Sequence, residues 1–257
     1  MASSYRALCS DFYVNQKISV KLDLPRSRDT MLELFERVRR EFKSMGTFRR
    51  YKDELALESP MPDHPHRWLA VRSGNIRSGV VNPDTFEEAY GLHRCVLEVA
   101  PYFLSISPLD IEYIEVLYGF DLGAPGNQDE IVADALLAGS PLASVFETEG
   151  ATPVDFQPLV GLAVRGSPTS TRPDTEAHFE VKTRSGGGAD VESPEPISLY
   201  VTLRRYEPVS DLKELSRVFA ELAETAQDLI EERAIPALLT PLREAINAGP
   251  GGAVGGL

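Results

Sequence analysis

Cysteine is scarce in this sequence, and Cys9 and Cys95 are the only two in 257 residues. A disulfide framework is therefore not expected, and a reducing cytoplasm is the default location. No apolar run approaches the length that spans a bilayer, so no membrane helix is predicted. The opening residues, MASSYRALCSDFYV, lack a basic start followed by an apolar core, which argues against a signal peptide.

Basic residues are in the minority, with 26 Lys and Arg against 39 Asp and Glu and a formal net charge of −13. The average surface should therefore repel nucleic acid and anionic lipid, although an average can conceal a local patch of the other sign. Hydrophobic residues make up 42% and charged residues 25%, as in an ordinary globular protein. The length allows one large domain or two small ones.

Catalytic signatures are missing too, since the chain has no G-x-S-x-G or S-x-x-K motif. The glycines at 186–188 are followed by neither Lys-Ser/Thr nor a helix, so they predict a flexible loop and not a phosphate site. His64 and His66 form the one His-x-His, which could present two imidazoles to a metal with His93 or Glu58 as a third ligand. Histidines separated by proline are more typical of a solvated turn, so we expect no metal, no cofactor and no catalytic residue.

What the sequence does contain is a clear run of strands and one long helix between residues 157 and 248. Residues 160–164, 177–184 and 196–206 each alternate apolar and polar side chains, which predicts three strands with one buried face. In the first of them, Val160, Leu162 and Val164 are expected to face the core. The helix that follows is expected to begin at Ser210, with Asp211 in its first turn.

This final helix should cover the sheet, because its apolar residues recur at three- and four-residue spacing. The stripe consists of Leu212, Leu215, Val218, Phe219, Leu222, Leu229 and Ile230. Pro236 and Pro241 should kink or break the helix, giving one piece to about Ala234 and a second ending near Asn247.

The rest of the chain predicts a similar succession of elements. The expected elements are a strand at 17–24, a helix at 28–45, a weak strand at 47–59, a hairpin of 68–72 and 77–81, a helix opened by Asn82-Pro83 and limited by Pro101, a strand at 111–122 and a helix capped by Asn127. The residues at 167–174 and 185–195 read as long polar connections.

Together these elements predict an α+β fold of two strand-helix-strands-helix halves, residues 1–108 and 109–248, with a flexible Gly-rich tail at 249–257. The strands should form one antiparallel sheet, or two abutting sheets, with the helices on one face and a long C-terminal helix.

Three stretches carry a resemblance: WLAVRSGNIRSGVVNPDTF (68–86), IEYIEVLYGFDL (111–122) and ISLYVTLRRYEP (197–208) running on through Phe219. They resemble a sporadically distributed family of uncharacterised bacterial proteins, and the element order resembles TATA-binding-protein-like and helix-grip architectures. This resemblance covers most of the chain and implies the same fold. It implies no activity and no site residues.

The polar face of the predicted sheet is the candidate site, because it is basic and aromatic while the helices are acid-rich. Its expected members are Lys17, Lys21, Arg72, Arg165, His178, Lys182, Arg184, Tyr200, Arg204 and Tyr206. The plainest interpretation is that these polar side chains only make the uncovered face of the sheet soluble in water. The sharper hypothesis is a non-catalytic binding or assembly protein with a protein partner or self-association, and the alternatives are nucleic-acid binding by the sheet and, third, a metal-dependent or hydrolytic enzyme.

Overall fold

The structure, a computed structural model, describes residues 2–146, 148–165, 174–183 and 196–249, except for the side chain of Arg165. The strands are β1 Asp11–Val20, β2 Thr47–Arg50, β3 Leu55–Glu58, β4 His66–Arg72, β5 Asn75–Val81, β6 Ile111–Leu122, β7 Leu159–Arg165, β8 Thr175–Lys182 and β9 Ile197–Arg205. The helices are α1 Ala2–Arg6, α2 Arg28–Glu41, α3 Phe86–Phe103, η1 Pro108–Asp110, α4 Gln128–Leu137, α5 Ala143–Phe146, η2 Leu212–Glu214, α6 Leu215–Leu229, η3 Ile230–Leu239 and α7 Thr240–Ala248.

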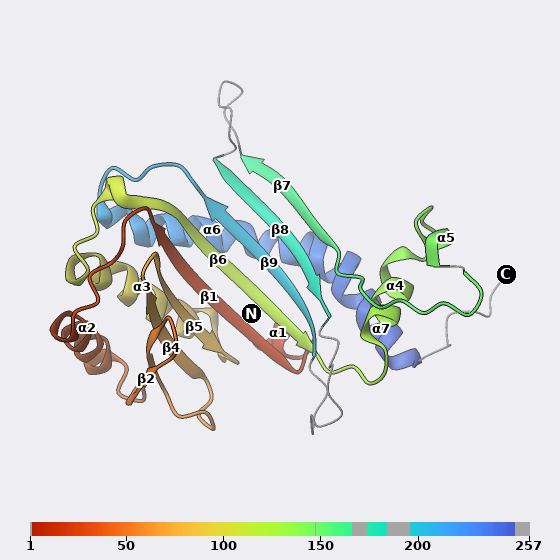
Figure 1. Ribbon diagram of the computed structural model, residues 1–257, viewed down its shortest axis with the longest axis horizontal. Helices are drawn as coiled ribbons and strands as arrows, with labels where there is room; N and C mark the ends of the chain where they lie inside the picture. Colours follow the sequence, from red (N-terminus) through yellow and green to blue (C-terminus); the bar gives the residue numbers. More distant parts are fainter. Residues whose placement is uncertain (1, 147, 166–173, 184–195, 250–257) are drawn as a thin grey trace.

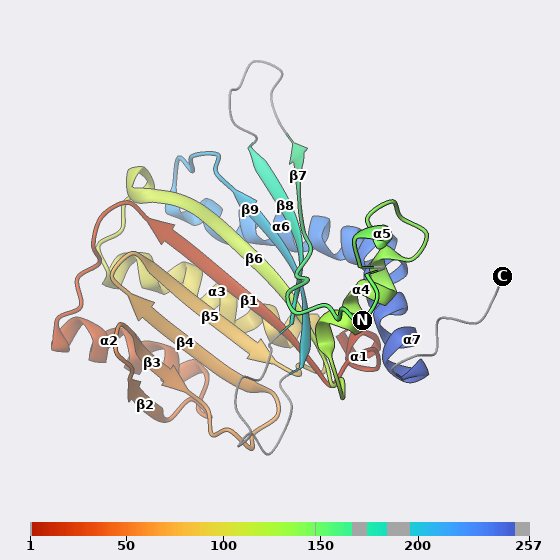
Figure 2. The same cartoon turned by 45° about the vertical axis from the view of Figure 1, so that its right-hand side comes forward.

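All nine strands belong to one antiparallel sheet in the order β2-β3-β4-β5-β1-β6-β9-β8-β7. The helices α3 and α6 pack against the same face of this sheet, and the opposite face turns toward the viewer in Figure 1 with no helix over its centre. Turning the molecule by 45° keeps both helices behind the strands (Figure 2). The expected α+β class with helices on one face is therefore confirmed.

The two halves of the chain meet in the middle of the sheet, where β1 pairs with β6 from Asp11 opposite Asp121 to Val20 opposite Ile111. The residues of β6 that were expected to share a face, Ile114, Val116, Tyr118 and Phe120, are all buried under the helices. Phe12 of β1 and Phe219 of α6 are buried beside them. Both halves thus contribute to one hydrophobic core.

The strand expected at 17–24 begins earlier and ends earlier, since β1 spans Asp11–Val20. Leu22 is 69% exposed and lies beyond the strand. The N-terminal part was missed because Gln16 interrupts the apolar alternation, although its side chain is buried on the helical face. There the Ser78 hydroxyl lies 3.1 Å from the Gln16 amide, which satisfies a polar group in the core.

The expectation that Asn82 and Pro83 open a helix is wrong. The helix α3 begins at Phe86, and Thr85 is its N-cap because the Thr85 side chain accepts a hydrogen bond from the Glu88 amide. Asn82 has a positive φ of 52°, and its side chain accepts from the Phe12 amide and donates to Asp11. Its amide is therefore used to hold β1 at the end of β5. Pro101 does not end α3, which runs on to Phe103.

The final helix follows the predicted stripe, with Leu215, Val218, Phe219 and Leu222 buried. Its start differs, because Asp211 and not Ser210 is the N-cap, accepting a hydrogen bond from the Lys213 amide. Pro236 lies inside the π-helical segment η3, so the chain stays helical through the proline instead of breaking at Ala234.

The remaining expectations differ in detail. The helix α2 ends at Glu41, four residues before Met45, and the weak strand at 47–59 is a hairpin of two short strands, β2 and β3. The strand at 160–164 is present as β7, but it carries exposed apolar residues that are described below. The connections at 167–174 and 185–195, apart from Asp174, and the tail beyond Gly249 lie outside the described residues.

Candidate binding surface on the open face of the sheet

The open face is the side of the sheet that points away from α3 and α6. Its side chains align in rows across the strands, because neighbouring strands are paired in register. The central row runs from Ala70 through Arg77, Lys17, Glu115 and Arg204 to Glu176. Basic and acidic side chains alternate over its second half, so this surface is of mixed charge.

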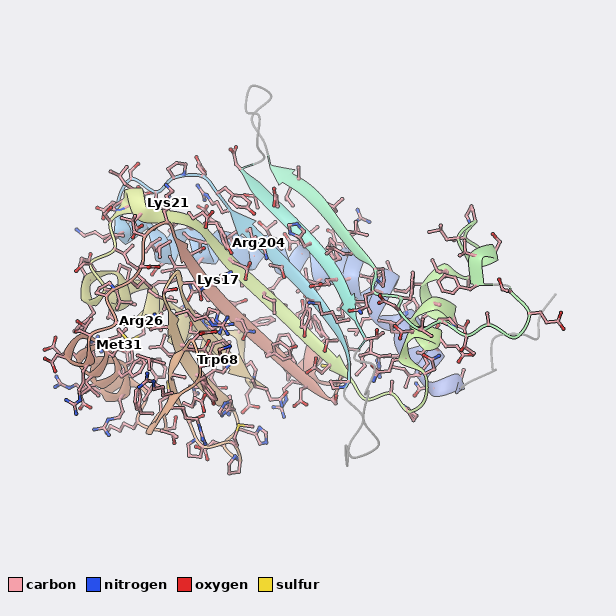
Figure 3. The ribbon with its side chains drawn as sticks, in the orientation of Figure 1. Lys17, Lys21, Arg26, Met31, Trp68 and Arg204 are labelled. Carbon is pink, nitrogen blue, oxygen red and sulfur yellow. The ribbon has the colours of Figure 1, made fainter. Side chains whose placement is uncertain are left out.

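The centre of the row is a cluster around Tyr113. Arg204 forms a hydrogen-bonded ion pair with Glu115, which is only 8% exposed. The guanidinium of Arg204 also lies 5.5 Å from the centre of the Tyr113 ring. Lys17 donates to the Tyr113 hydroxyl over 2.6 Å. The ring of Tyr206 meets that of Tyr113 edge to face at 5.5 Å. Two cations and two tyrosines are thereby held in fixed positions. Figure 3 shows Lys17 and Arg204 in this part of the sheet.

A second cluster lies toward the other end of the same strands. Tyr13 and Ser198 both donate to the Asp121 carboxylate, over 3.1 and 2.7 Å. Burial and the nearby Asp121 charge raise the pKa of Tyr13, so its hydroxyl stays protonated and remains a donor. The Tyr13 ring lies 6.4 Å from that of Tyr200, and Lys182 reaches over Tyr200 at 5.9 Å. This cluster is an aromatic pair with an acid on one side and a lysine on the other.

The third cluster surrounds Trp68, the single tryptophan of the chain, on β4. Its ring lies against Gly79 of β5, where an added Cβ would overlap the indole. Arg77 lies 5.8 Å from the indole, and Glu54 pairs with both Arg77 and Arg72. These residues border a hollow of about 550 Å³ on the open face. The hollow therefore combines an aromatic ring with a carboxylate shared by two guanidinium groups.

Several buried polar atoms of this face have no hydrogen-bond partner among the described residues. They are Asn15 Oδ1, Asn75 Oδ1, Arg77 Nε and His178 Nδ1. Most buried polar groups in proteins are paired with protein or water, because an unpaired one costs about 1–3 kcal/mol. These four atoms are buried among the side chains of the sheet, so a partner lying on the open face would not reach them.

Seven of the ten residues predicted for the site lie on this face: Lys17, Arg72, His178, Lys182, Tyr200, Arg204 and Tyr206. Lys21 does not, because β1 ends at Val20 and the Lys21 ammonium donates to the Leu109 carbonyl. The side chain of Arg165 and all of Arg184 lie outside the described residues.

The sequence did not predict Trp68, Arg77, Tyr13 or Tyr113 as members of the site, although all four occupy the open face. Nor did the sequence predict that the basic side chains of this face form ion pairs with acidic ones. On the described part of the face, each of Arg72, Arg77, Lys182 and Arg204 pairs with a glutamate. The alternation within a strand predicts on which face of the sheet a side chain lies. Its ion-pair partner on the next strand depends on the register between the two strands.

The candidate metal ligands are not brought together. His66 Nδ1 lies 3.2 Å from the Ser59 hydroxyl, Glu58 interacts with Arg49 and Tyr51, and His93 is buried beneath the opposite face. In the part of the chain that the structure describes, no three His, Cys, Asp or Glu side chains are arranged to hold a metal ion.

A buried polar trio lies on the helical side of the sheet. His93 of α3 places Nδ1 2.8 Å from the Ser78 hydroxyl and Nε2 3.2 Å from the Val14 carbonyl, and Ser78 also contacts Gln16. Burial lowers the pKa of His93 to about 3, so the imidazole is neutral. Ser78 and His93 are completely buried, so no substrate reaches them and the trio serves to position β1, β5 and α3.

A second cavity, of about 660 Å³, lies between α2 and the hairpin of β2 and β3. Met31, Leu32, Phe48 and Leu55 give it an apolar floor, and its rim carries Arg26, Arg28, Arg50 and Lys52 with Asp53 and Glu54. Figure 3 labels Arg26 and Met31 at the end of the molecule that holds α2, to the left of Lys17 and Arg204. This cavity was not predicted, because its residues come from two separate segments, 26–32 and 48–55, that only the fold brings together.

Comparison with models of known protein families finds no match, and comparison with curated proteins finds none either. The resemblance carried by residues 68–86 and 111–122 therefore stays a prediction. Within the described ranges, no helix is both long and apolar enough to cross a membrane.

Proposed function

We propose that this protein is a non-catalytic binding or assembly protein whose open face receives a protein partner. The observation that carries the proposal is an aromatic face of paired charges that no described helix covers (Figure 1). Tryptophan, tyrosine and arginine are the residues that contribute most to protein interfaces, because each combines a large contact area with a polar group. Trp68, Tyr200 and Arg204 each belong to a different one of the three clusters on the open face.

Nucleic-acid binding is the weaker alternative, because it depends on cations that are free to replace counterions. On this face Arg204 is committed to Glu115, and Lys182 to Glu180 at 3.1 Å. The protein also carries a net charge of −13, which opposes the approach of a polyanion. Mixed, paired charge instead suits a partner that presents both signs.

The proposal is tested by photo-cross-linking in extracts of the cells that make the protein. A benzophenone amino acid replaces Tyr200 on the open face or, as a matched control, Tyr102, which is exposed on α3. We expect a discrete cross-linked protein band from position 200 that is absent from position 102, and that disappears when Trp68→Ala is added. Equal cross-linking from both positions, or none from position 200, would contradict the proposal.

The alternative is tested separately on heparin and on single-stranded oligonucleotides. We expect the purified protein to pass through a heparin column at about 50 mM salt, because its open face has little uncompensated positive charge. Retention that is lost as salt rises, and that Arg204→Gln weakens while Arg217→Gln on α6 does not, would favour nucleic acid over a protein partner.

A further inference from the structure

The strand β7 forms one edge of the sheet and exposes its apolar side chains. It pairs with β8 and is the last strand in the sheet order, and it rises at the outer side of the sheet in Figures 1 and 2. Leu159, Val160 and Leu162 are 59%, 53% and 48% exposed. These values correct the expectation that Val160 and Leu162 are buried. Both face the helical side, opposite Phe179 and Ala177 of β8, but no described helix extends over them.

The backbone of β7 leaves alternate residues free to pair with another strand. The Val181 amide donates to the Pro158 carbonyl, which makes these two residues a hydrogen-bonded pair. Because hydrogen-bonded and non-hydrogen-bonded pairs alternate in an antiparallel ladder, Val160 and Leu162 also bond toward β8. The amides and carbonyls of Leu159, Gly161 and Ala163 therefore point away from the sheet.

The other edge of the sheet is protected in the usual manner, and β7 is not. β2 is four residues long and carries Arg49 and Arg50, and charge on a short edge strand discourages pairing with another chain. In β7 the residues 159–164 carry no charge and no proline. The ladder is regular from Leu159 to Ala163 and shifts register only at the far end. An uncharged, regular and apolar edge strand is a template for another strand.

We infer that β7 pairs with β7 of a second copy of this chain, antiparallel and about a two-fold axis through Gly161. In this register Gly161 faces Gly161 of the second copy, which is a hydrogen-bonded pair on the outward side of both strands. Val160 then lies opposite Leu162 of the second copy on the helical side. Leu159 lies opposite Ala163 of the second copy on the open side. The Val160–Leu162 and Leu159–Ala163 contacts are apolar and each occurs twice, while the Gly161 pair lies on the axis, as an isologous interface requires.

A second copy fits better than a charged or polar peptide because residues 159–164 carry no charge to match. The pairing would also shield Val160 and Leu162, which extend the core-facing row of β8 into solvent. It would join two nine-stranded sheets into one and bring two open faces side by side. The inference concerns a different surface from the proposed partner site, so either can fail alone.

Sedimentation velocity and light scattering over about 1–200 μM protein test the pairing. A five-residue strand contact is smaller than a standard interface, so we expect a reversible dimer with a Kd in the micromolar range. The double variant Val160→Lys/Leu162→Lys should be monomeric throughout. Val154→Lys, an exposed residue just before the strand, is the matched control and should dimerise like the wild type.

The register is tested by cysteine cross-linking in the full-length chain. In the non-hydrogen-bonded pair of Val160 with Leu162 of the second copy, the Cα atoms would lie about 4.5 Å apart with the side chains close together, as a disulfide requires. Val160→Cys/Leu162→Cys should give a disulfide-linked dimer under mild oxidation, whereas Val154→Cys should not. A wild type that stays monomeric up to 200 μM, or a dimer that the double lysine variant leaves intact, would overturn the inference. Near-native circular dichroism of the double variant excludes misfolding as the cause of its monomeric state.

Discussion

At the scale of single residues, the buried histidine of α3 links the stability of the fold to pH. His93 is neutral in the folded protein because burial lowers its pKa to about 3. In the unfolded chain its pKa is near 6.5, so the unfolded state binds a proton that the folded state excludes. The stabilisation is therefore complete above pH 6.5 and is lost as the pH falls toward 3.

Replacing this histidine should remove that pH dependence. From pH 7.5 to pH 5 we expect the wild type to lose about 2 kcal/mol of unfolding free energy more than His93→Gln, because linkage gives about 1.4 kcal/mol per pH unit below the unfolded pKa. Urea denaturation at several pH values measures the difference. His64→Gln, an exposed histidine, should follow the wild type. If His93→Gln and the wild type ran parallel, His93 would have to be charged in the fold.

At the scale of elements, the close contact between β4 and β5 depends on a glycine. Trp68 lies across Gly79, so that the indole shields the backbone of the neighbouring strand. A methyl group at position 79 would overlap the ring, and the ring must then leave its position. The hollow of the open face would change shape with it, because Trp68 forms part of its wall.

Gly79→Ala should therefore shift the fluorescence emission of the single tryptophan to longer wavelength. The displaced indole becomes more exposed to water, and we expect a cost of about 1–3 kcal/mol in unfolding free energy from overpacking. Gly46→Ala is the control, since nothing lies within 4 Å of a Cβ at that position. An unchanged emission spectrum in folded Gly79→Ala would show that Trp68 does not rest on β5.

The elements also show what the sequence could predict. The strand at 111–122 was predicted with its bounds, because Ile114, Val116, Tyr118 and Phe120 recur there at every second position. The start of β1 was missed because Gln16 is polar yet buried, and only its contact with Ser78 across the sheet explains that. β7 was found, but its exposure was not, since alternation cannot tell whether a helix reaches the strand.

The candidate site was predictable to the same extent. Alternation placed Lys182 and Arg204 on one face, and the structure puts them there. The alternation could not predict that Glu54 pairs with both Arg72 and Arg77, because Glu54 lies in the turn between β2 and β3. Long-range pairing decides the charge of the surface, and a single strand carries no information about it.

At the scale of the whole molecule, the first half of the chain, residues 1–108, and the second, residues 109–248, share one sheet and one core. β1 of the first half lies between β5 of its own half and β6 of the second. Neither half can therefore lose its structure without exposing a long strand edge and apolar side chains of the other. We expect the halves to unfold together in one cooperative transition.

Trp68 gives a direct measurement of this coupling, because it reports on the first half alone. Leu199 of β9 is fully buried in the second half, and Leu199→Ala should cost about 2–5 kcal/mol through the lost contacts and the cavity that remains. If the halves are coupled, the Trp68 fluorescence transition moves to lower urea by the same amount as the circular dichroism transition. Leu109→Ala, at an 86% exposed position, should move neither. A Trp68 transition that stays at its wild-type midpoint in Leu199→Ala would mean that β1 and β6 can separate, and that the two halves fold as independent units despite their common sheet.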